Sequence, residues 1–335
     1  MPLKIAVVGT GAVAASNYIP FLAGQSDVEL GLYNRTPEKA QQVAQKFNAV
    51  VFSSLKEIAD WNPTAVLVLT SETVRYEVTS QLLELGIRRL FFEKPLVATM
   101  GQAHVTENDF HKGKALLEKA REVNCETAMI FNYRFFPQSL AAKRIVAERN
   151  FGELINVSGL IHFACWSHCI DLIHHFGGSV ATITALPGNI ERHTYIQDLV
   201  DIKAKDVTAA FVMQNGATGT LIGTAGLKWQ HPLYELIFCF ENGRLHVRDL
   251  NGTLEVLDGH HQMHETHTPV RHTSRWDSYQ DSFGKSLEAY LDSLRKSTPP
   301  PVPGIDGLKE LQVEAALKRS IEQRRPVQVQ AEFSL

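Results

Sequence analysis

Gly9, Gly11 and Ala14 stand at the spacing G-x-G-x-x-A, directly after the apolar run Lys4–Val8. The first glycine permits a tight turn, the second lets the backbone approach a pyrophosphate, and the small third residue permits close packing of a helix on a strand. The helix that opens there offers N–H groups and a partial positive charge to phosphate oxygens. The alternative is a glycine-rich turn that binds nothing. The spacing favours a dinucleotide-binding turn made of Gly9, Thr10, Gly11, Ala12, Val13 and Ala14.

The residues after the second apolar run, Val28–Tyr33, bear on which dinucleotide binds. An Asp or Glu at this place holds the ribose hydroxyls of NAD, whereas an Arg accommodates the 2′-phosphate of NADP. The chain has Asn34, Arg35 and Thr36 there. Because no carboxylate would repel a phosphate and Arg35 can pair with one, NADP is favoured. The alternative is NAD held through Asn34, with Arg35 a solvated loop residue.

Lys94 follows the fifth apolar run, Arg89–Phe92, and stands between Glu93 and Pro95. Ligands of open α/β sheets bind at the carboxyl edge of the strands, so a lysine here can reach both a nicotinamide and a substrate hydroxyl. The residue before a proline is pushed toward extended geometry, which would aim the Lys94 side chain into a cleft. Thr70, at the end of the fourth run, and Glu93 complete the expected cofactor contacts. The alternative is an exposed loop lysine.

Together these segments resemble the glucose–fructose oxidoreductase, inositol dehydrogenase and rhizopine-catabolism (Gfo/Idh/MocA) family of NAD(P)-dependent oxidoreductases. The likeness covers nearly the whole chain. Besides the turn at 9–14 and Glu93-Lys94-Pro95 it includes Asn132-Tyr133-Arg134-Phe135, Lys143, residues 151–155, Ser167-His168-Cys169-Ile170-Asp171, residues 306–308 and residues 316–320. The resemblance implies that Lys94 contacts cofactor and substrate and that His168 acts as acid and base.

Such a pair suits the oxidation of a secondary alcohol of a sugar, polyol or sugar derivative. Hydride loss from carbon requires removal of the hydroxyl proton, which a histidine can accept near neutral pH, and Lys94 would stabilise the developing alkoxide. Asp171, three residues after His168, would orient groups at the site or form an ion pair there; alternatively it is a helix N-terminal carboxylate. Arg134 and Trp166 are the further candidate substrate contacts; Trp166 would stack on a sugar face or lie in the core.

The chain departs from the family pattern at three places. Many members carry a carboxylate four residues before the histidine, where this chain has Ala164, so any second catalytic group would be Asp171 or His162. The segment Gly101–Gly113 looks like an extra loop, for which a lid, an oligomer contact and a tolerated insertion are all open. The third departure lies after the fourth strand, at Ser71-Glu72 and Tyr76.

Two other functions are compatible with this fold. A redox-assisted lyase or glycosidase would hold and recycle its NAD, and the missing carboxylate at position 164 leaves that alternative open. A non-catalytic dinucleotide-binding regulator is the third, because a fold does not determine a function. The presence of both Lys94 and His168 favours an enzyme.

The elements that position these residues fall into two parts. Strands and helices alternate through the first third, which predicts a Rossmann doubly wound parallel sheet in a dinucleotide-binding domain over residues 1–130. Short strands separated by Gly, Asn and Asp turns then predict an α+β domain over residues 131–335 with a large, mostly antiparallel open sheet for substrate binding and oligomerisation. Its exposed face predicts a homodimer or homotetramer.

Composition excludes several classes of partner. The net charge of −3 over 335 residues shows no basic stripe, so nucleic acid is not expected. No apolar run approaches the roughly 20 residues that span a bilayer, and the first residues are typical of a strand and turn rather than a signal peptide, so we expect a cytoplasmic protein. Cys165 and Cys169 around His168 predict a shared buried face. The histidines between 260 and 272 predict a solvated loop, so no metal site is expected.

Overall fold

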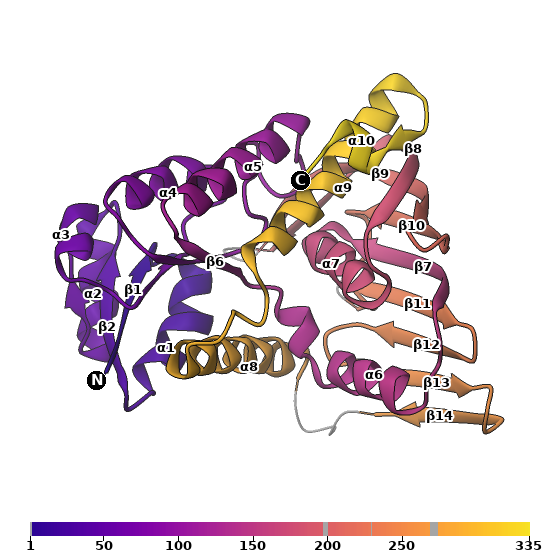
Figure 1. Ribbon diagram of the computed structural model, residues 1–335, viewed down its shortest axis with the longest axis horizontal. Coiled ribbons are helices and arrows are strands. Elements are labelled where there is room, and N and C mark those ends of the chain that lie inside the picture. Colours follow the sequence, from indigo (N-terminus) through magenta and orange to yellow (C-terminus); the bar gives the residue numbers. More distant parts are fainter. Residues whose placement is uncertain (1, 197–199, 229, 269–273) are drawn as a thin grey trace. The chain divides into compact units, whose positions relative to one another are not determined.

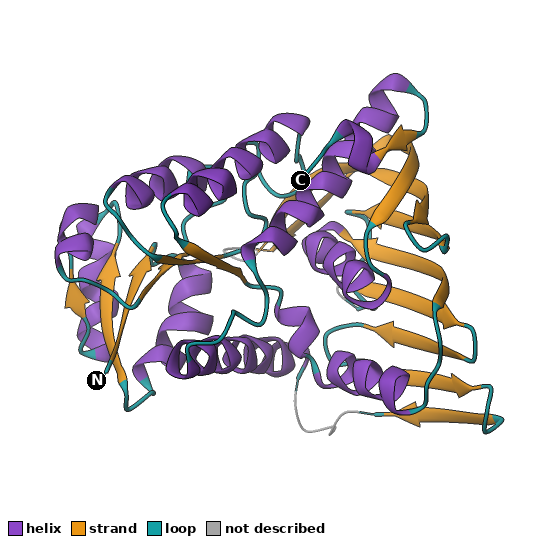
Figure 2. Cartoon of the chain, viewed as in Figure 1, coloured by secondary structure: helices purple, strands orange, loops and turns teal. Residues whose placement is uncertain are grey.

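The computed structural model describes residues 2–196, 200–228, 230–268 and 274–335. The chain forms two compact units, Met1–Ile130 with Phe283–Leu311, and Phe131–Ser282 with Gln312–Leu335. The segment 283–311 therefore packs with the first unit although it follows residue 130 by more than 150 positions in the sequence. Each unit contains one sheet (Figure 2).

The first unit contains a six-stranded parallel sheet in the order β3-β2-β1-β4-β5-β6. Its strands are β1 (Leu3–Val8), β2 (Val28–Tyr33), β3 (Val50–Val51), β4 (Ala65–Val68), β5 (Arg89–Phe92) and β6 (Glu126–Met129). The connecting helices are η1 (Ala14–Tyr18, with π geometry), α1 (Ile19–Ala23), α2 (Pro37–Phe47), α3 (Leu55–Asp60), α4 (Arg75–Glu84) and α5 (Glu107–Glu122) (Figure 1). The predicted Rossmann fold is confirmed. The strand order reverses between β1 and β4, which is where such sheets bind ligands.

Two details of the first unit differ from the expectation. The sixth strand, β6, was not predicted, since its sequence Glu-Thr-Ala-Met contains neither an apolar run nor several β-branched residues. The expected loop Gly101–Gly113 is wrong over its second half, because α5 begins at Glu107. The Asp109 carboxylate accepts the backbone N–H of Thr106 at 2.8 Å, and Thr-x-x-Asp before a helix is a start signal that the prediction overlooked.

The second unit contains a nine-stranded sheet in the order β14-β13-β12-β11-β7-β10-β9-β8-β15, in which only β7 and β10 pair in parallel. The strands are β7 (Leu154–His162), β8 (Val180–Ile196), β9 (Val200–Met213), β10 (Thr218–Thr224), β11 (Tyr234–Phe240), β12 (Gly243–Arg248), β13 (Leu254–Asp258), β14 (Met263–His267) and β15 (Val327–Gln328). Helices α6 (Pro137–Glu148) and α7 (Trp166–Gly177) lie on one face of this sheet, beside β12 and β7 (Figure 1). Short elements complete this unit: η2 (Asn132–Phe135), η3 (Phe163–Cys165) and α10 (Val329–Glu332). The predicted open, mostly antiparallel sheet is confirmed.

Strands β8 and β9 pair as far as Ile196 and Val200, beyond the irregularity near Pro187. One prediction in this unit requires correction. The expected solvated histidine loop is wrong for Met263–His267, which pairs with β13 as the edge strand β14. Its side chains remain largely exposed, which is why its pattern resembles a loop. His272 lies outside the described residues.

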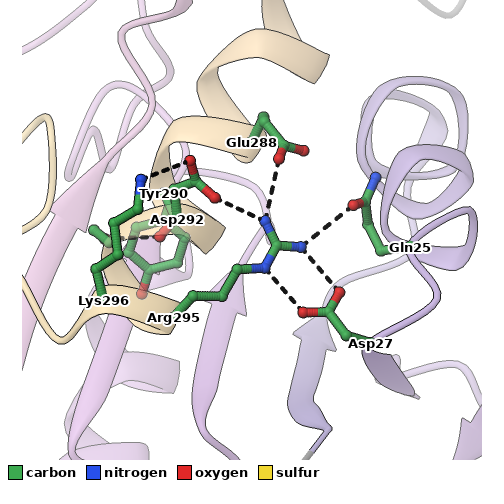
Figure 3. A network of polar contacts seen from close by, with 8 residues as sticks. Gln25, Asp27, Glu288, Tyr290, Asp292, Arg295 and Lys296 are labelled. Carbon is green, nitrogen blue, oxygen red and sulfur yellow. Dashed lines mark hydrogen bonds and ion pairs between the residues drawn. The ribbon is translucent and has the colours of Figure 1, made fainter.

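Two long helices contribute residues to both units, α8 (Arg275–Lys296) and α9 (Gly304–Gln323). The end of α8 is fastened to the first unit by Arg295, which pairs with Asp27 through two bonds of 2.9 Å (Figure 3). Asp292 and Glu288 on α8 accept further hydrogen bonds from the same guanidinium. A buried aromatic contact between Phe91 and Tyr290, at 4.7 Å, holds the same helix against β5. These contacts are why residues 283–296 pack with the Rossmann sheet.

Within the described ranges, no helix is long and apolar enough to cross a membrane. The same residues contain no group of three or more His, Cys, Asp or Glu side chains that could hold a metal ion.

Candidate functional site

The turn after β1 admits only glycine at position 9. Gly9 has φ +103°, and a Cβ there would lie 2.8 Å from the backbone of Leu69 and Thr70. The Gly9 N–H donates to the carbonyl of Tyr33 at 2.8 Å. The turn therefore touches the ends of both neighbouring strands, β2 and β4, at the carboxyl edge of the sheet.

The polar groups at this edge fit a phosphate-bearing ligand. No atom lies within 4 Å of the position that a Cβ on Gly11 would take. Among the described residues, the buried hydroxyl oxygens of Thr10 and Thr70 have no hydrogen-bond partner. Buried hydroxyls almost always have one, so two such donors beside an open glycine fit the acceptor oxygens of a dinucleotide.

The turn after β2 is joined to the glycine turn by Asn34. Its Oδ1 accepts the N–H of Thr10 at 3.2 Å, and its Nδ2 donates to the carbonyl of Thr36 at 3.0 Å. The Asn34 amide thus connects the two turns. Arg35 and Thr36 have exposed side chains on the outside of this connection.

A buried charged network lies beneath the Lys94 turn. Glu93 accepts from the Tyr18 hydroxyl at 3.0 Å and from the Lys94 N–H at 2.5 Å. Burial raises the pKa of Glu93, and the charges of Lys94 and Arg75 oppose that rise. Arg75 is 2% exposed and donates to three carbonyls, those of Glu93, Pro95 and Thr70. One guanidinium therefore joins the carboxyl ends of β4 and β5.

The Lys94 side chain is half-buried and its ammonium has a specific partner. The peptide bond from Lys94 to Pro95 is cis. Nζ donates to Oε1 of Gln102 at 2.7 Å. Gln102 belongs to the loop that precedes α5, so this loop contacts the predicted lysine directly.

In the second unit, His168 on α7 lies in an aromatic cluster. Its ring stacks on Tyr133 with centroids 4.1 Å apart and planes 8° apart, and it meets Phe131 edge-on at 5.9 Å. The histidine is 2% exposed. The Tyr133 hydroxyl donates to Sγ of Cys165 at 3.1 Å, and burial raises the pKa of that tyrosine. The predicted acid and base is thus firmly packed.

Two predicted residues of the second unit pair with each other. Arg134 Nε donates to Oδ2 of Asp171 at 2.8 Å, and Nη2 donates to Oδ1. Asp171 is 1% exposed and does not belong to the first turn of α7, so the ion pair, not the helix dipole, accounts for its burial.

Trp166 and His162 serve the packing of the second unit. Trp166 is 3% exposed, packs edge-on against Phe163 and covers Gly223. His162 accepts the Ala164 N–H at Nδ1. Its Nε2 lies 3.0 Å from the Thr194 hydroxyl, which itself donates to a carbonyl, so Nε2 is the donor. Burial lowers the pKa of His162 to about 4, so the ring is neutral.

Sequence reasoning missed three residues of the first unit, namely Tyr18, Arg75 and Gln102. Tyr18 and Arg75 lie on helices, where polar side chains are normally assigned to the solvent face. Gln102 lies in the loop whose end was misplaced. The sequence contained one signal for Arg75: an arginine at the start of a helix, five residues after the predicted Thr70.

Comparisons with known proteins agree on the family of the first unit. Residues 3–125 match the GFO_IDH_MocA model, an oxidoreductase family with an NAD-binding Rossmann fold. An uncharacterized oxidoreductase of Schizosaccharomyces pombe is 30% identical over 160 residues, and the match spans 46% of this chain but only 40% of that protein. The myo-inositol 2-dehydrogenase of Thermotoga maritima is 23% identical over 301 residues, 82% of each chain.

Solved structures extend the likeness to the whole fold. An oxidoreductase from Agrobacterium radiobacter, in complex with NAD+, L-tartaric acid and magnesium, has a TM-score of 0.80 at 18% identity and covers 99% of this chain and 100% of its own. The super-repressor mutant of Gal80p from Saccharomyces cerevisiae has a TM-score of 0.81 at 14% identity, with both chains covered completely. At such identities the likeness shows a shared fold and leaves the activity open.

Proposed function

Because the chain belongs, through its first unit, to the Gfo/Idh/MocA oxidoreductase family with an NAD-binding Rossmann fold, we propose that it is an NAD(P)-dependent oxidoreductase. It transfers hydride between the nicotinamide and a secondary alcohol or ketone of a sugar, polyol or sugar derivative. One observation carries the proposal. The Lys94 ammonium stands on the same sheet whose glycine turn and unpartnered Thr10 and Thr70 hydroxyls fit a dinucleotide.

We assign the preference between NAD and NADP to the turn after β2. Arg35 is exposed there, and the Asn34 amide is already engaged with Thr10 and Thr36. An exposed guanidinium can pair with a 2′-phosphate, so NADP is the proposed cofactor. We expect NADPH to bind more tightly than NADH in a fluorescence titration, and Arg35→Asp to reverse the order. Equal affinities of the native protein for both would reject this assignment.

When bound, the nicotinamide supplies or takes up hydride. Lys94 donates a hydrogen bond to the substrate oxygen and stabilises negative charge that develops on it. His168 carries the proton, a role that requires its ring to become accessible from the aromatic cluster. Asp171 fixes Arg134, so its part is positioning within the second unit.

The test is a cofactor-resolved screen of the purified protein. NAD+, NADP+ and their reduced forms are each combined with a panel of inositols, sugars and keto-sugars, and absorbance of the reduced nicotinamide is followed. Stoichiometric conversion is expected, and Lys94→Ala should lower kcat/KM by about 10²- to 10³-fold. Arg121→Ala, on the exposed surface of α5, is the matched control. Failure of the native protein to bind any nicotinamide dinucleotide would refute the proposal.

A dinucleotide-binding regulator is the second candidate. It is favoured by the packed His168 and by the likeness to the Gal80p super-repressor mutant. The two candidates differ in one measurement. A regulator binds the dinucleotide without net turnover in the screen, whereas an oxidoreductase consumes it.

The outer face of the nine-stranded sheet supports a homodimer or homotetramer. Leu186, Ile222 and Leu160 occupy one row across β8, β9, β10 and β7, with Thr208 between the first two. They are 69%, 43% and 36% exposed in the single chain. An apolar row of this kind is usually covered by a partner. Sedimentation should show an assembly that the double substitution Leu160→Glu with Ile222→Glu dissociates, and a monomeric native protein would overturn the idea.

A further inference from the structure

The Lys94 ammonium is held by a side chain that no part of the proposed function yet uses. Nζ donates to Oε1 of Gln102 at 2.7 Å. A lysine can only donate, so chemistry fixes the orientation of the Gln102 amide: the oxygen faces Lys94 and the NH₂ group faces away. The ammonium keeps two further N–H bonds, and the Gln102 NH₂ group is a further donor beside it.

The loop that carries Gln102 is fastened at several points. The Gln102 N–H donates to Oε1 of Glu72 at 3.2 Å, and the Ala98 N–H donates to the Glu72 carbonyl at 3.3 Å. At its two ends, Thr99 and Thr106 each donate a backbone N–H and a hydroxyl to the fully buried carboxylate of Asp109. A tolerated insertion would not need such anchoring.

These contacts connect two departures from the family pattern. Glu72 follows β4, and the loop 98–106 precedes α5. In the structure Glu72 holds the loop in place, and Gln102 of the loop holds the Lys94 ammonium. The two departures thus form one device around Lys94.

We infer that Gln102 is a positioning residue for Lys94, held by Glu72 and Asp109, and that the loop 98–106 is a built part of the site. The role given to this positioning rests on the proposed function, whereas the experiment that tests it does not depend on that function. The ammonium and the amide NH₂ together fit a substrate whose reacting oxygen has a second acceptor oxygen on the neighbouring carbon, as in a vicinal diol, a hydroxyketone or a 2-hydroxy acid.

The test measures the reactivity of the Lys94 amine. The full-length protein is labelled with limiting acetic anhydride over a pH series, and the Lys94 peptide is quantified by mass spectrometry. Only the uncharged amine reacts, so removing the acceptor by Gln102→Ala should increase labelling about three- to tenfold at a given pH. Gln102→Glu places a carboxylate of the same shape there and should move the labelling profile to higher pH.

His104→Ala changes an exposed side chain of the same loop and is the matched control. It should label as the native protein does, and thermal unfolding establishes that each variant is folded. If Gln102→Ala and Gln102→Glu, folded, both gave the native profile, the positioning role would be overturned. Because labelling requires neither cofactor nor substrate, that result rejects the inference alone, whereas failure to bind a dinucleotide rejects the proposed function alone.

Discussion

Replacing Arg75 with Met should destabilise the first unit by about 3–5 kcal/mol, the range found when one partner of a buried charged network is removed. The guanidinium is 2% exposed and donates to the carbonyls of Thr70, Glu93 and Pro95. Methionine fills much of the same space but donates nothing. It leaves three carbonyl oxygens without these donors and removes a cation beside the buried Glu93 carboxyl.

The magnitude follows from the individual losses. An unsatisfied buried acceptor costs about 1–3 kcal/mol. Three such losses sum to about 3–9 kcal/mol, and two effects bring the total toward the lower part of that span. The bond to the Thr70 carbonyl is only partly buried, so water can replace the donor there. Loss of the Arg75 charge also raises the pKa of Glu93 further, and the carboxyl can then take up a proton.

Hydrogen exchange followed by mass spectrometry measures this locally, in peptides that cover β4 and β5. A loss of 3–5 kcal/mol lowers protection by about two to three and a half powers of ten. The control is Lys56→Ala, which removes a pair with Asp60 whose side chains are 71% and 61% exposed and should cost less than about 0.5 kcal/mol. If Arg75→Met lowered protection no more than Lys56→Ala, the argument for a buried clamp would be refuted.

Three further predictions concern single residues. Gly9→Ala places a Cβ 2.8 Å from backbone at φ +103° and should cost at least about 2 kcal/mol in thermal unfolding, whereas Gly11→Ala, with no atom within 4 Å, should keep the native stability and lose dinucleotide binding; equal stabilities would contradict this. Asp171→Ala removes the buried carboxylate that accepts two hydrogen bonds from Arg134 and should cost about 3 kcal/mol, with no change expected from Arg144→Ala on the exposed side of α6. For His162, the unfolded chain binds its proton near pH 6.5 and the folded chain only near pH 4. The free energy of unfolding should therefore decrease as the pH is lowered through that window, by up to about 3 kcal/mol in urea unfolding. A His162→Gln variant with the same pH slope would disprove the burial argument.

Local patterns were sufficient for most of the first unit. The strands Val28–Tyr33 and Arg89–Phe92 have the bounds of the apolar runs that predicted them, because an apolar run is a signal within a few neighbouring residues. β6 and β14 escaped prediction because each becomes a strand only through its partner, β5 or β13. Edge pairing is a tertiary effect, and a single sequence does not display it.

The candidate site likewise contains residues that local sequence patterns predict and residues that only the fold brings together. Gly9 and Lys94 follow from spacing and from the position of a strand end. Arg75 and Gln102 do not, because their roles depend on contacts with carbonyls and an ammonium brought close by the fold. Arg134 was expected to meet a substrate, and in the structure it pairs with Asp171 among its partners. Residue type predicted that these groups matter, and only the structure shows which group each one satisfies.

The candidate residues of the two units differ in the kind of partner that surrounds them. In the first unit, Thr10 and Thr70 present hydroxyls that no described residue satisfies, and Lys94 and Gln102 present donors together. In the second unit, the ring of His168 is stacked on a tyrosine. The unsatisfied donors beside the glycine turn mark where a ligand can complete the hydrogen bonding, whereas the stacked aromatic rings around His168 already stabilise the fold. Substitutions of Lys94 should therefore reduce turnover with little change in stability, while His168→Ala should reduce both, because it also leaves a cavity in the aromatic cluster.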